Sequence, residues 1–211
     1  MQCDKHAPHI VLASSSPRRI ELMKNLGIDF LVKPSDLDEV VKEALEPGEI
    51  VTELAAHKAG RVLDLVIGEQ LYPQGEPIVV LGSDTIVVLD KDVLGKPPDR
   101  ASAIAMLKRL SGRKHEVYTG VCVLYADESG QVKVYQEVDV SNVYFRQLGE
   151  TEIENYVDTG EPMDKAGSYA LQGIGAFLIA KIEGCVTNII GLPVPKTVKL
   201  LRRCGINILG Q

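Results

Sequence analysis

The chain has 211 residues, which fits one domain or two tightly joined lobes because single hydrophobic cores stop growing near about 250 residues. Hydrophobic residues make up 45% and charged residues 25% of the sequence, a balance that excludes a disordered chain. The 23 basic residues are outnumbered by 29 acidic ones, and the net charge of -6 argues against general adhesion to nucleic acid or anionic membranes. A small anionic ligand in a locally basic pocket stays compatible with this charge.

The cysteines and the apolar runs narrow the class of protein further. The four cysteines are scattered without a CxxC pair, so the sequence predicts neither a zinc site nor a disulfide framework. Residues 1–16 lack the apolar core of a signal peptide, and no run reaches the roughly 18 apolar residues of a membrane span. We therefore expect a cytoplasmic protein with buried free thiols.

Hydrophobic periodicity alternates between the patterns of strands and helices along the chain. In order, it predicts a strand over 9–13, a helix over 17–26, a strand over 30–32, a helix over 49–68, a strand over 77–90, a helix between Asp99 and Gly112, a hairpin of strands over 115–125 and 132–145, a helix over 153–157, a strand over 176–182 and a helix over 195–203. This order predicts an α/β fold with a mixed, partly antiparallel central sheet flanked by helices.

Residues 14–19, with the sequence SSSPRR, combine hydroxyl groups, two guanidinium groups and the expected N-terminus of a helix. Together they can bind phosphate, because the helix dipole and charge-assisted hydrogen bonds both attract an anion. Two arginines here oppose the dipole by about 0.3–1 kcal/mol each, which indicates that they serve an anion. The alternative is a serine-capped helix whose arginines are solvated or pair with Glu21 or the loop at Asp36. The motif is not a P-loop.

The apolar stretch 77–90 is interrupted by GSDT at residues 82–85. We interpret it as a central strand that runs into a second strand segment, with Asp84 at the polar break between them. A carboxylate at such a strand end can hold a metal ion or deprotonate a water molecule. The alternative is an aspartate that ends a strand and accepts hydrogen bonds from loop amides. Its apolar neighbours favour the functional interpretation, because a lone carboxylate is costly there.

Three further features are weaker signals. Residues 161–175 combine an adjacent acid–base pair with glycines, which is typical of a rigid ligand-binding loop but also of plain turns and surface ion pairs. Lys58 in LAAHKA and Lys96 in LGKP are lone lysines of a kind that is usually solvated. His115 has no base or nucleophile at catalytic spacing, so we expect it to be structural.

Taken together and in order, several segments resemble the Maf family of nucleoside triphosphate pyrophosphatases, also called septum formation inhibitor proteins. The segments are LASSSPRR at 12–19, LAAHKA at 54–59, GSDT at 82–85, GKP at 95–97, LSGRKH at 110–115, GEPMDKAG at 160–167 and NIIGLP at 188–193. The resemblance implies a fold like that of inosine triphosphate pyrophosphatase, with two lobes around a cleft, one functional unit over 1–211, and commonly a homodimer. It also implies cleavage of a nucleoside triphosphate between its α and β phosphates, with magnesium or manganese required.

The same resemblance assigns roles residue by residue. The catalytic set comprises Asp84, which matches the family's proton acceptor, with Glu39, Lys58 and Lys96. The candidate metal ligands are Asp84 and Glu39. The substrate-binding set comprises Ser14, Arg18, Arg19, Thr85, Asp164, Lys165 and Gln172. Of these, Arg18, Thr85 and Gln172 match positions associated with base selection.

The chain departs from the family's usual pattern at two places. The usual GADT is GSDT here, a small change beside the catalytic carboxylate that we expect to be tolerated. The usual YGIQ is YALQ at 169–172, which leaves Gln172 in register but adds a methyl group where the backbone passes near the base. The pattern of Thr85, residues 164–167 and Gln172 resembles the branch that acts on dTTP and UTP, including some modified pyrimidines, rather than the 7-methyl-GTP branch.

Electrostatics favours the same activity. A triphosphate carries about four negative charges, so its hydrolysis needs cations and a carboxylate that holds a metal ion or activates water. Asp84 and Glu39 supply the oxygen ligands that magnesium prefers, and which of them takes the proton is left open. Two alternatives stay open: a nucleotide-sensing regulator of cell division with incidental hydrolysis, and a phosphatase that removes the terminal phosphate.

Overall fold

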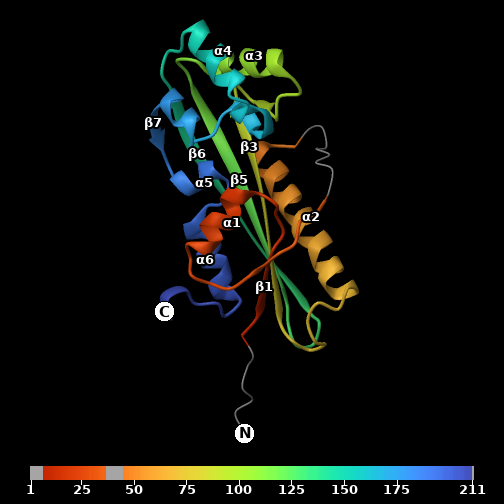
Figure 1. Cartoon of the computed structure of the whole chain (residues 1–211). Helices are drawn as coiled ribbons and strands as arrows, with labels where there is room; N and C mark the ends of the chain where they lie inside the picture. Colours follow the sequence, from red (N-terminus) through yellow and green to blue (C-terminus); the bar gives the residue numbers. More distant parts are fainter. Residues whose placement is uncertain (1–6, 37–44, 211) are drawn as a thin grey trace. The chain divides into compact units, whose positions relative to one another are not determined.

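The computed structural model describes residues 7–36 and 45–210, which build a seven-stranded mixed sheet with helices (Figure 1). The strands are β1 (His9–Leu12), β2 (Leu31–Val32), β3 (Ile78–Leu89), β4 (Asp92–Leu94), β5 (Lys114–Ala126), β6 (Val132–Phe145) and β7 (Ile179–Glu183). Their order is β2-β1-β3-β5-β6-β7, and β4 pairs with β3. β1 pairs in parallel with β2 and β3, whereas the β3–β4 and β6–β7 pairs are antiparallel. The predicted mixed α/β sheet is confirmed.

The helices follow the predicted order with few changes. They are α1 (Pro17–Lys24), α2 (Pro47–Gly68), α3 (Arg100–Leu110), α4 (Glu150–Asp158), α5 (Val186–Ile190) and α6 (Val194–Arg203), with the 3₁₀ helices η1 (Glu161–Asp164), η2 (Ala166–Ser168), η3 (Ile174–Leu178) and η4 (Ile208–Gly210). Local chemistry explains several ends. Ser16 is the N-cap of α1 before Pro17, and the Asp99 side chain accepts a 2.7 Å hydrogen bond from the amide of Ser102 at the start of α3.

The chain divides into two compact units. Unit 1 comprises residues up to Asp84, Gly120–Val138 and the segment from Gly191 onward, and unit 2 comprises Thr85–Thr119 and Asp139–Ile190. β3, β5 and β6 contribute residues to both units. The prediction of one functional unit made of two lobes around a cleft is not tested by this division and stays a prediction.

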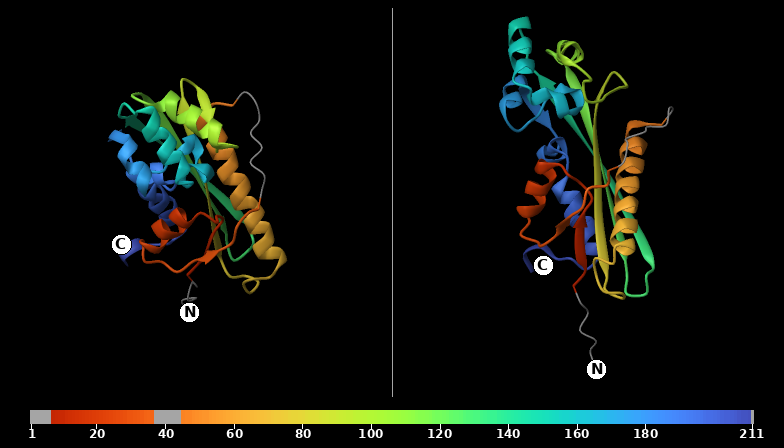
Figure 2. Two further views of the ribbon diagram at one scale, coloured as in Figure 1. Left: turned by 45° about the horizontal axis from the view of Figure 1, so that its top comes forward. Right: turned by 45° about the vertical axis from the view of Figure 1, so that its right-hand side comes forward.

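Unit 1 is a layered structure. α2 lies against one face of its strands, and α1 and α6 lie on the opposite face (Figures 1 and 2). The apolar stripe of α2 packs into a core with the β1, β3 and β5 side chains. This core includes Val11, Ala55, Ala59, Val62, Val80 and Cys122, each fully buried. α2 therefore forms because one of its faces is apolar and has a sheet to cover.

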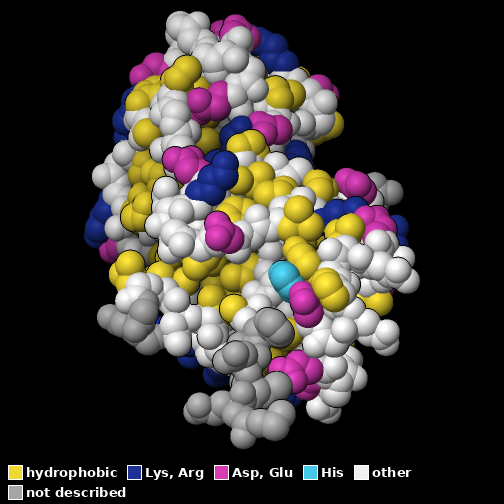
Figure 3. Space-filling model, turned by 60° about the horizontal axis from the view of Figure 1, so that its bottom comes forward, with side chains coloured by type: hydrophobic (Ala, Val, Ile, Leu, Met, Phe, Trp, Pro, Cys, Tyr) yellow, Lys and Arg dark blue, Asp and Glu magenta, His cyan; other side chains and the backbone are white. Residues whose placement is uncertain are grey.

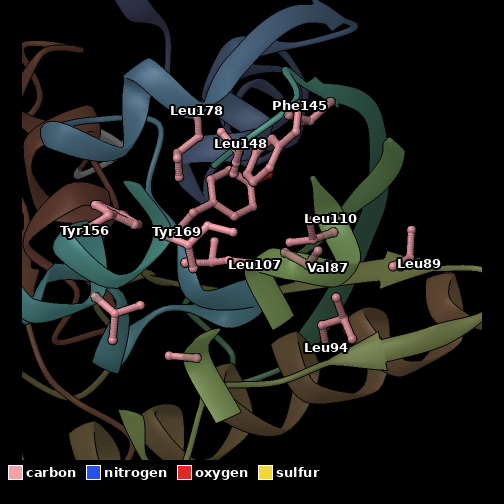
Figure 4. Packing of buried hydrophobic residues seen from close by; sticks show 14 of the residues in the cluster. Val87, Leu89, Leu94, Leu107, Leu110, Phe145, Leu148, Tyr156, Tyr169 and Leu178 are labelled. Carbon is pink, nitrogen blue, oxygen red and sulfur yellow. The ribbon is translucent and has the colours of Figure 1, made fainter. Parts of the chain in front are cut away.

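Unit 2 has its own core, in which β3, β5 and β6 meet α3, α4 and η3 (Figure 4). Tyr169 lies among Leu107, Leu148 and Leu178 in this cluster. The ring of Tyr169 contacts that of Phe145 edge to face, with their centroids 4.8 Å apart. Such aromatic contacts add to the free energy that burial alone contributes.

Three predictions about the elements are corrected. β3 is one continuous strand of 12 residues, so Asp84 lies within a strand and not at a break or end. The strand does not break because its polar side chains have partners: Ser83 Oγ donates to the carbonyls of Gly120 and Gly191, both at 3.0 Å. The segment predicted as a strand over 176–182 begins as η3 and becomes β7 only at Ile179. The short elements β4 and α5 were not predicted.

Candidate functional site

Lys58 and Asp84 form a buried ion pair in unit 1. Lys58 lies on α2 and Asp84 on β3, and their side chains are 11% and 5% exposed. Lys58 Nζ donates a 2.5 Å hydrogen bond to Asp84 Oδ1. Because water screens buried charges poorly, the ammonium group stabilises the ionised carboxylate strongly. The structure thus brings together two of the four residues predicted as catalytic.

Two glycines allow α2 to approach the sheet closely enough to make this pair. A Cβ atom on Gly82 would lie 2.2 Å from the carbonyl oxygen of Ala55 and 2.9 Å from the amide nitrogen of Ala59. A Cβ atom on Gly120 would lie 2.2 Å from the carbonyl oxygen of Val51. Side chains at these positions would hold the helix away from the strands. Gly82, two residues before Asp84 on β3, therefore lets α2 bring Lys58 up to the carboxylate.

The SSSPRR turn connects to the same strand through a shared backbone carbonyl. Ser14 Oγ accepts a 3.2 Å hydrogen bond from the amide of Ser16 and lies 3.5 Å from Arg19 Nη1. Arg19 Nε donates a 2.8 Å hydrogen bond to the carbonyl of Gly191, which also accepts from Ser83 Oγ. Arg19 is therefore held against the backbone at residue 191, a contact that the sequence did not predict. Ser83, the departure from the family pattern, is fully buried and ties the strand to this arginine's acceptor.

Unit 2 contains the other predicted site residues, of which Thr85 lies at the start of its β3 segment. Thr85 Oγ1 and Thr119 Oγ1 are 2.9 Å apart, and Thr119 Oγ1 donates a 2.9 Å hydrogen bond to the carbonyl of Asn188. The amide of Gly167 donates a 3.1 Å hydrogen bond to the carbonyl of Gly95. This bond joins the GKP and DKAG segments through their backbones.

Gly167 has a close fit that explains its place in the DKAG segment. Its φ of +68° is in the left-handed region, and a Cβ atom on it would lie 3.0–3.1 Å from the side chain of Val87. Lys96 follows Gly95 and is exposed. The segments that carry Lys96 and Lys165 are thus neighbours in unit 2.

The acid–base pair of this loop is more buried than a plain surface pair. Lys165 Nζ donates to Asp164 Oδ1, and it also donates a 3.2 Å hydrogen bond to the carbonyl of Glu161. The Asp164 side chain is 72% exposed, whereas that of Lys165 is only 13% exposed. The interpretation as a simple surface pair therefore holds for the acid and fails for the base, whose ammonium group also donates to a backbone carbonyl of its own loop.

Gln172 and Glu161 complete the unit 2 group. Gln172 is exposed and lies in the segment before η3. Glu161, which the sequence interpretation left without a role of its own, accepts hydrogen bonds from the amides of Ile174 and Gly175. Its position in the GEP segment was visible in the sequence, but its partners 13 and 14 residues away were not.

The predicted site residues therefore form two sets. Unit 1 holds Ser14, Arg18, Arg19, Lys58 and Asp84, and unit 2 holds Thr85, Lys96, Asp164, Lys165 and Gln172. Glu39, predicted as a catalytic residue and metal ligand, lies outside the described residues. In both sets a loop or helix is joined to the central strand β3 by hydrogen bonds or close packing.

Three other reactive side chains, His115, Cys122 and Cys204, are buried. Burial lowers the pKa of His115 to about 4, and its Nε2 lies 2.8 Å from the Tyr169 hydroxyl, in agreement with the predicted structural role. Burial also raises the pKa of Cys122 and Cys204 to about 11, so these thiols stay protonated and unreactive at neutral pH. Within the part of the chain that the structure describes, the cysteines are free thiols, as predicted, but only Cys122 and Cys204 are buried and Cys185 is partly exposed.

The charges on the surface agree with the mixed composition of 23 basic and 29 acidic residues. On the face drawn in Figure 3, basic and acidic side chains are interspersed with hydrophobic ones rather than gathered in one large patch of a single sign. No helix among residues 7–36 and 45–210 is long and apolar enough to cross a membrane.

Fold and site together define a class: an α/β protein with a mixed sheet, in which a lysine-paired aspartate on a central strand lies in the same unit as a serine- and arginine-rich turn. The model of the Maf-like protein family matches residues 9–204. The chain belongs to this family.

Curated relatives match over nearly their full lengths. The dTTP/UTP pyrophosphatase of Desulforamulus reducens is 46% identical over 200 residues, covering 95% of this chain and 98% of that protein. That of Symbiobacterium thermophilum is 47% identical and covers 94% and 95%. A HAM1 protein from Coxiella burnetii, a solved structure, aligns at 16% identity with a TM-score of 0.40, covering 76% of this chain and 86% of that one. The fold assignment rests on the strand order and not on this distant likeness.

Proposed function

We propose that the chain hydrolyses nucleoside triphosphates between the α and β phosphates and prefers dTTP and UTP, with modified pyrimidine nucleotides as further substrates. The buried Lys58–Asp84 pair carries this proposal, because it holds an ionised carboxylate at a fixed place on a central strand. Relatives at 46% and 47% identity that are named dTTP/UTP pyrophosphatases support the choice of reaction and base. The homodimer implied by the family resemblance is part of the same proposal.

In this proposal Asp84 accepts the proton of the water molecule that attacks the α phosphorus. Lys58 keeps the carboxylate ionised and in place. Arg18 and Arg19, in the same unit as Asp84, are the proposed cations that neutralise the charge developing on the departing pyrophosphate. The roles that the family resemblance assigns to Lys96 and Lys165 stay predictions.

A divalent metal ion fits the available donors only with help from the substrate. In the described ranges 7–36 and 45–210, no three His, Cys, Asp or Glu side chains gather as a metal site. Magnesium is commonly held by one or two carboxylates together with substrate phosphates, so Asp84 is a sufficient described ligand. Bound magnesium or manganese would shield the phosphate oxygens. Glu39 is the second proposed ligand.

Asp84→Asn tests the proposed reaction, because it keeps the shape of the side chain and removes the proton acceptor. Chromatography of the products from a panel of triphosphates should identify nucleoside monophosphate and pyrophosphate for the parent. We expect the variant to lose at least about 100-fold in turnover while its nucleotide binding stays measurable. Asp99→Asn is the matched control, since asparagine caps a helix as well as aspartate does.

Other outcomes would assign a different function. Hydrolysis of UTP by Asp84→Asn at the parental rate would remove Asp84 from the mechanism. Release of a diphosphate and orthophosphate would indicate a phosphatase acting on the terminal phosphate. Nucleotide binding and division phenotypes that both survive Asp84→Asn would favour a nucleotide-sensing regulator of cell division.

A further inference from the structure

The Glu161 carboxylate holds the loop that carries Gln172. Its Oε2 accepts a 2.9 Å hydrogen bond from the amide of Ile174, and its Oε1 accepts 2.8 Å hydrogen bonds from the amide of Gly175 and the hydroxyl of Tyr156. Successive amides that point at one anion form a nest, a backbone arrangement suited to negative charge. Glu161 therefore fixes the backbone two and three residues after Gln172.

The loop is closely fitted around this carboxylate. Gly173 has φ +94° and ψ −153°, a conformation that is essentially restricted to glycine, and a Cβ atom on it would lie 2.6 Å from Glu161 Oε2. A Cβ atom on Gly175 would lie 2.5 Å from both the carbonyl oxygen of Ala170 and the Tyr156 hydroxyl. Two glycines are therefore needed where the loop passes the carboxylate and the hydroxyl.

Glu161 with its three donors, which we call the clamp, is charged and anchored in the core. Burial raises the pKa of Glu161, but the hydrogen bonds from Gly175, Tyr156 and Ile174 outweigh this effect and lower the pKa overall. Glu161 is therefore ionised at neutral pH. Tyr156 is 2% exposed and belongs to the unit 2 core (Figure 4). The loop is thus tied, through one carboxylate, to a side chain that cannot move without disturbing the core.

We propose that Glu161 is a positioning residue for base recognition: it holds residues 170–175 so that the Gln172 amide is presented in one orientation. Gln172 is exposed, so its place depends on the backbone that carries it. A glutamine side chain offers an N–H donor beside a carbonyl acceptor, which is complementary to the carbonyl and N–H groups of uracil and thymine. This inference rests on the proposed function, because Gln172 must read the base for its orientation to matter.

A double-mutant cycle of Glu161→Gln and Gln172→Ala tests the inference. The measured quantity is the ratio of kcat/KM for UTP to that for CTP or ATP, with kcat and KM also determined separately. Glu161→Gln should lower this ratio about tenfold, roughly the contribution of one hydrogen bond, through a higher KM for UTP at a similar kcat. The double variant should lose no more base preference than Gln172→Ala alone, because both substitutions remove the same contact between Gln172 and the base.

Asp127→Asn is the matched control. The Asp127 carboxylate also accepts hydrogen bonds from two amides and one hydroxyl, those of Ser129, Gln131 and the Ser129 side chain, but it does so in the β5–β6 turn of unit 1. The control should lose stability and keep the parental base preference. A Glu161→Gln variant that does the same, or additive losses in the cycle, would overturn the positioning role.

The parent enzyme separates this inference from the proposed function. A parent enzyme without preference for dTTP and UTP would overturn the proposed substrate choice. Hydrogen exchange would still test whether Glu161 holds the loop. In that experiment the amides of Ile174 and Gly175 should exchange about tenfold faster in Glu161→Gln than in the parent, while those of Ser129 and Gln131 stay unchanged. Unchanged exchange at Ile174 and Gly175 would show that Glu161 does not hold the loop.

Discussion

The two units place their site residues in different ways. In unit 1, Lys58 and Asp84 lie on a 22-residue helix and a 12-residue strand, and their meeting depends on how closely these elements pack. In unit 2, Lys165 and Gln172 lie between short 3₁₀ helices, and bonds from side chains to the backbone hold these segments. Regular elements give unit 1 a stiff frame, whereas unit 2 depends on a few individual hydrogen bonds.

Backbone conformation marks the same difference. The segment 160–173 contains Gly160, Gly167, Ser168 and Gly173 at positive φ. Ser168 is a fully buried non-glycine residue at φ 61°, a strained conformation that persists only where its surroundings determine it. The unit 1 positions Lys58 and Asp84 lie in regular helix and strand. The two sets should therefore respond differently to substitution, and unit 1 should be the more sensitive to loss of a buried charge.

Lys58→Met should have the largest effect on stability. It leaves the Asp84 carboxylate 5% exposed without this cation, which should lower the free energy of unfolding by about 3–5 kcal/mol. Lys165→Met is the contrasting variant, because the partner of Lys165, Asp164, is 72% exposed. This substitution should lower the free energy of unfolding by less than about 1 kcal/mol. Urea unfolding of both variants measures the difference. Equal losses in the two variants would contradict the contrast between the units. Adding Asp84→Asn to Lys58→Met should restore most of the lost stability.

His115 should make unit 2 sensitive to acid. Its pKa is about 4 in the folded chain and about 6.5 in the unfolded chain, because burial disfavours its charged form. The unfolded chain therefore takes up the proton first, and stability that is fully present above pH 6.5 falls as the pH drops toward 4. The loss between pH 7 and pH 4.5 should be about 2–3 kcal/mol.

Denaturant unfolding at these two pH values checks the prediction in the parent and in His115→Gln, which cannot titrate. The variant should lose about 2–3 kcal/mol less than the parent on acidification. His57→Gln is the control for the substitution itself, since His57 is exposed on α2. Parallel pH curves for the parent and His115→Gln would show that another group governs the acid response.

Gly82→Ala should lower the free energy of unfolding by about 3 kcal/mol, the upper end for overpacking, because its Cβ atom would press on the backbone of α2 at Ala55 and Ala59. Turnover should also fall, since moving α2 displaces Lys58 from Asp84. Gly60→Ala is the control on the same helix: a Cβ atom there meets nothing within 4 Å, and the variant should gain up to about 1 kcal/mol. Thermal unfolding and triphosphate hydrolysis, measured on the same samples, test both statements.

The elements were predictable where local chemistry decides them. Pro17 after Ser16 and the Asp99 cap mark the starts of α1 and α3, and both helices begin where predicted. β3 was wrongly divided because a carboxylate in an apolar run looks like an ending. What satisfies the polar side chains of the strand is distant in sequence: Lys58, 26 positions before Asp84, and the carbonyls of Gly120 and Gly191 for Ser83. Pairs of this separation leave no local pattern in a sequence.

The candidate site follows the same rule. The residue types and their order led to Asp84, Lys58 and the SSSPRR turn, and the structure joins the first two directly. The importance of Gly82 was hidden, because a glycine needed for close helix packing looks like any other glycine until the helix is in place. Glu161 was hidden for a similar reason, since its partners are backbone amides, which every sequence contains.

The shared carbonyl of Gly191 has a consequence for how the protein is made. It accepts hydrogen bonds from Arg19, 172 positions earlier, and from Ser83, 108 positions earlier. Contacts of such long range form late, because the entropy of closing a long loop must first be overcome. A chain still leaving the ribosome would hold its arginine-rich turn and its central strand without the acceptor that joins them. The hydrogen bonds that join Arg19 and Ser83 to this carbonyl therefore form only after Gly191 has emerged.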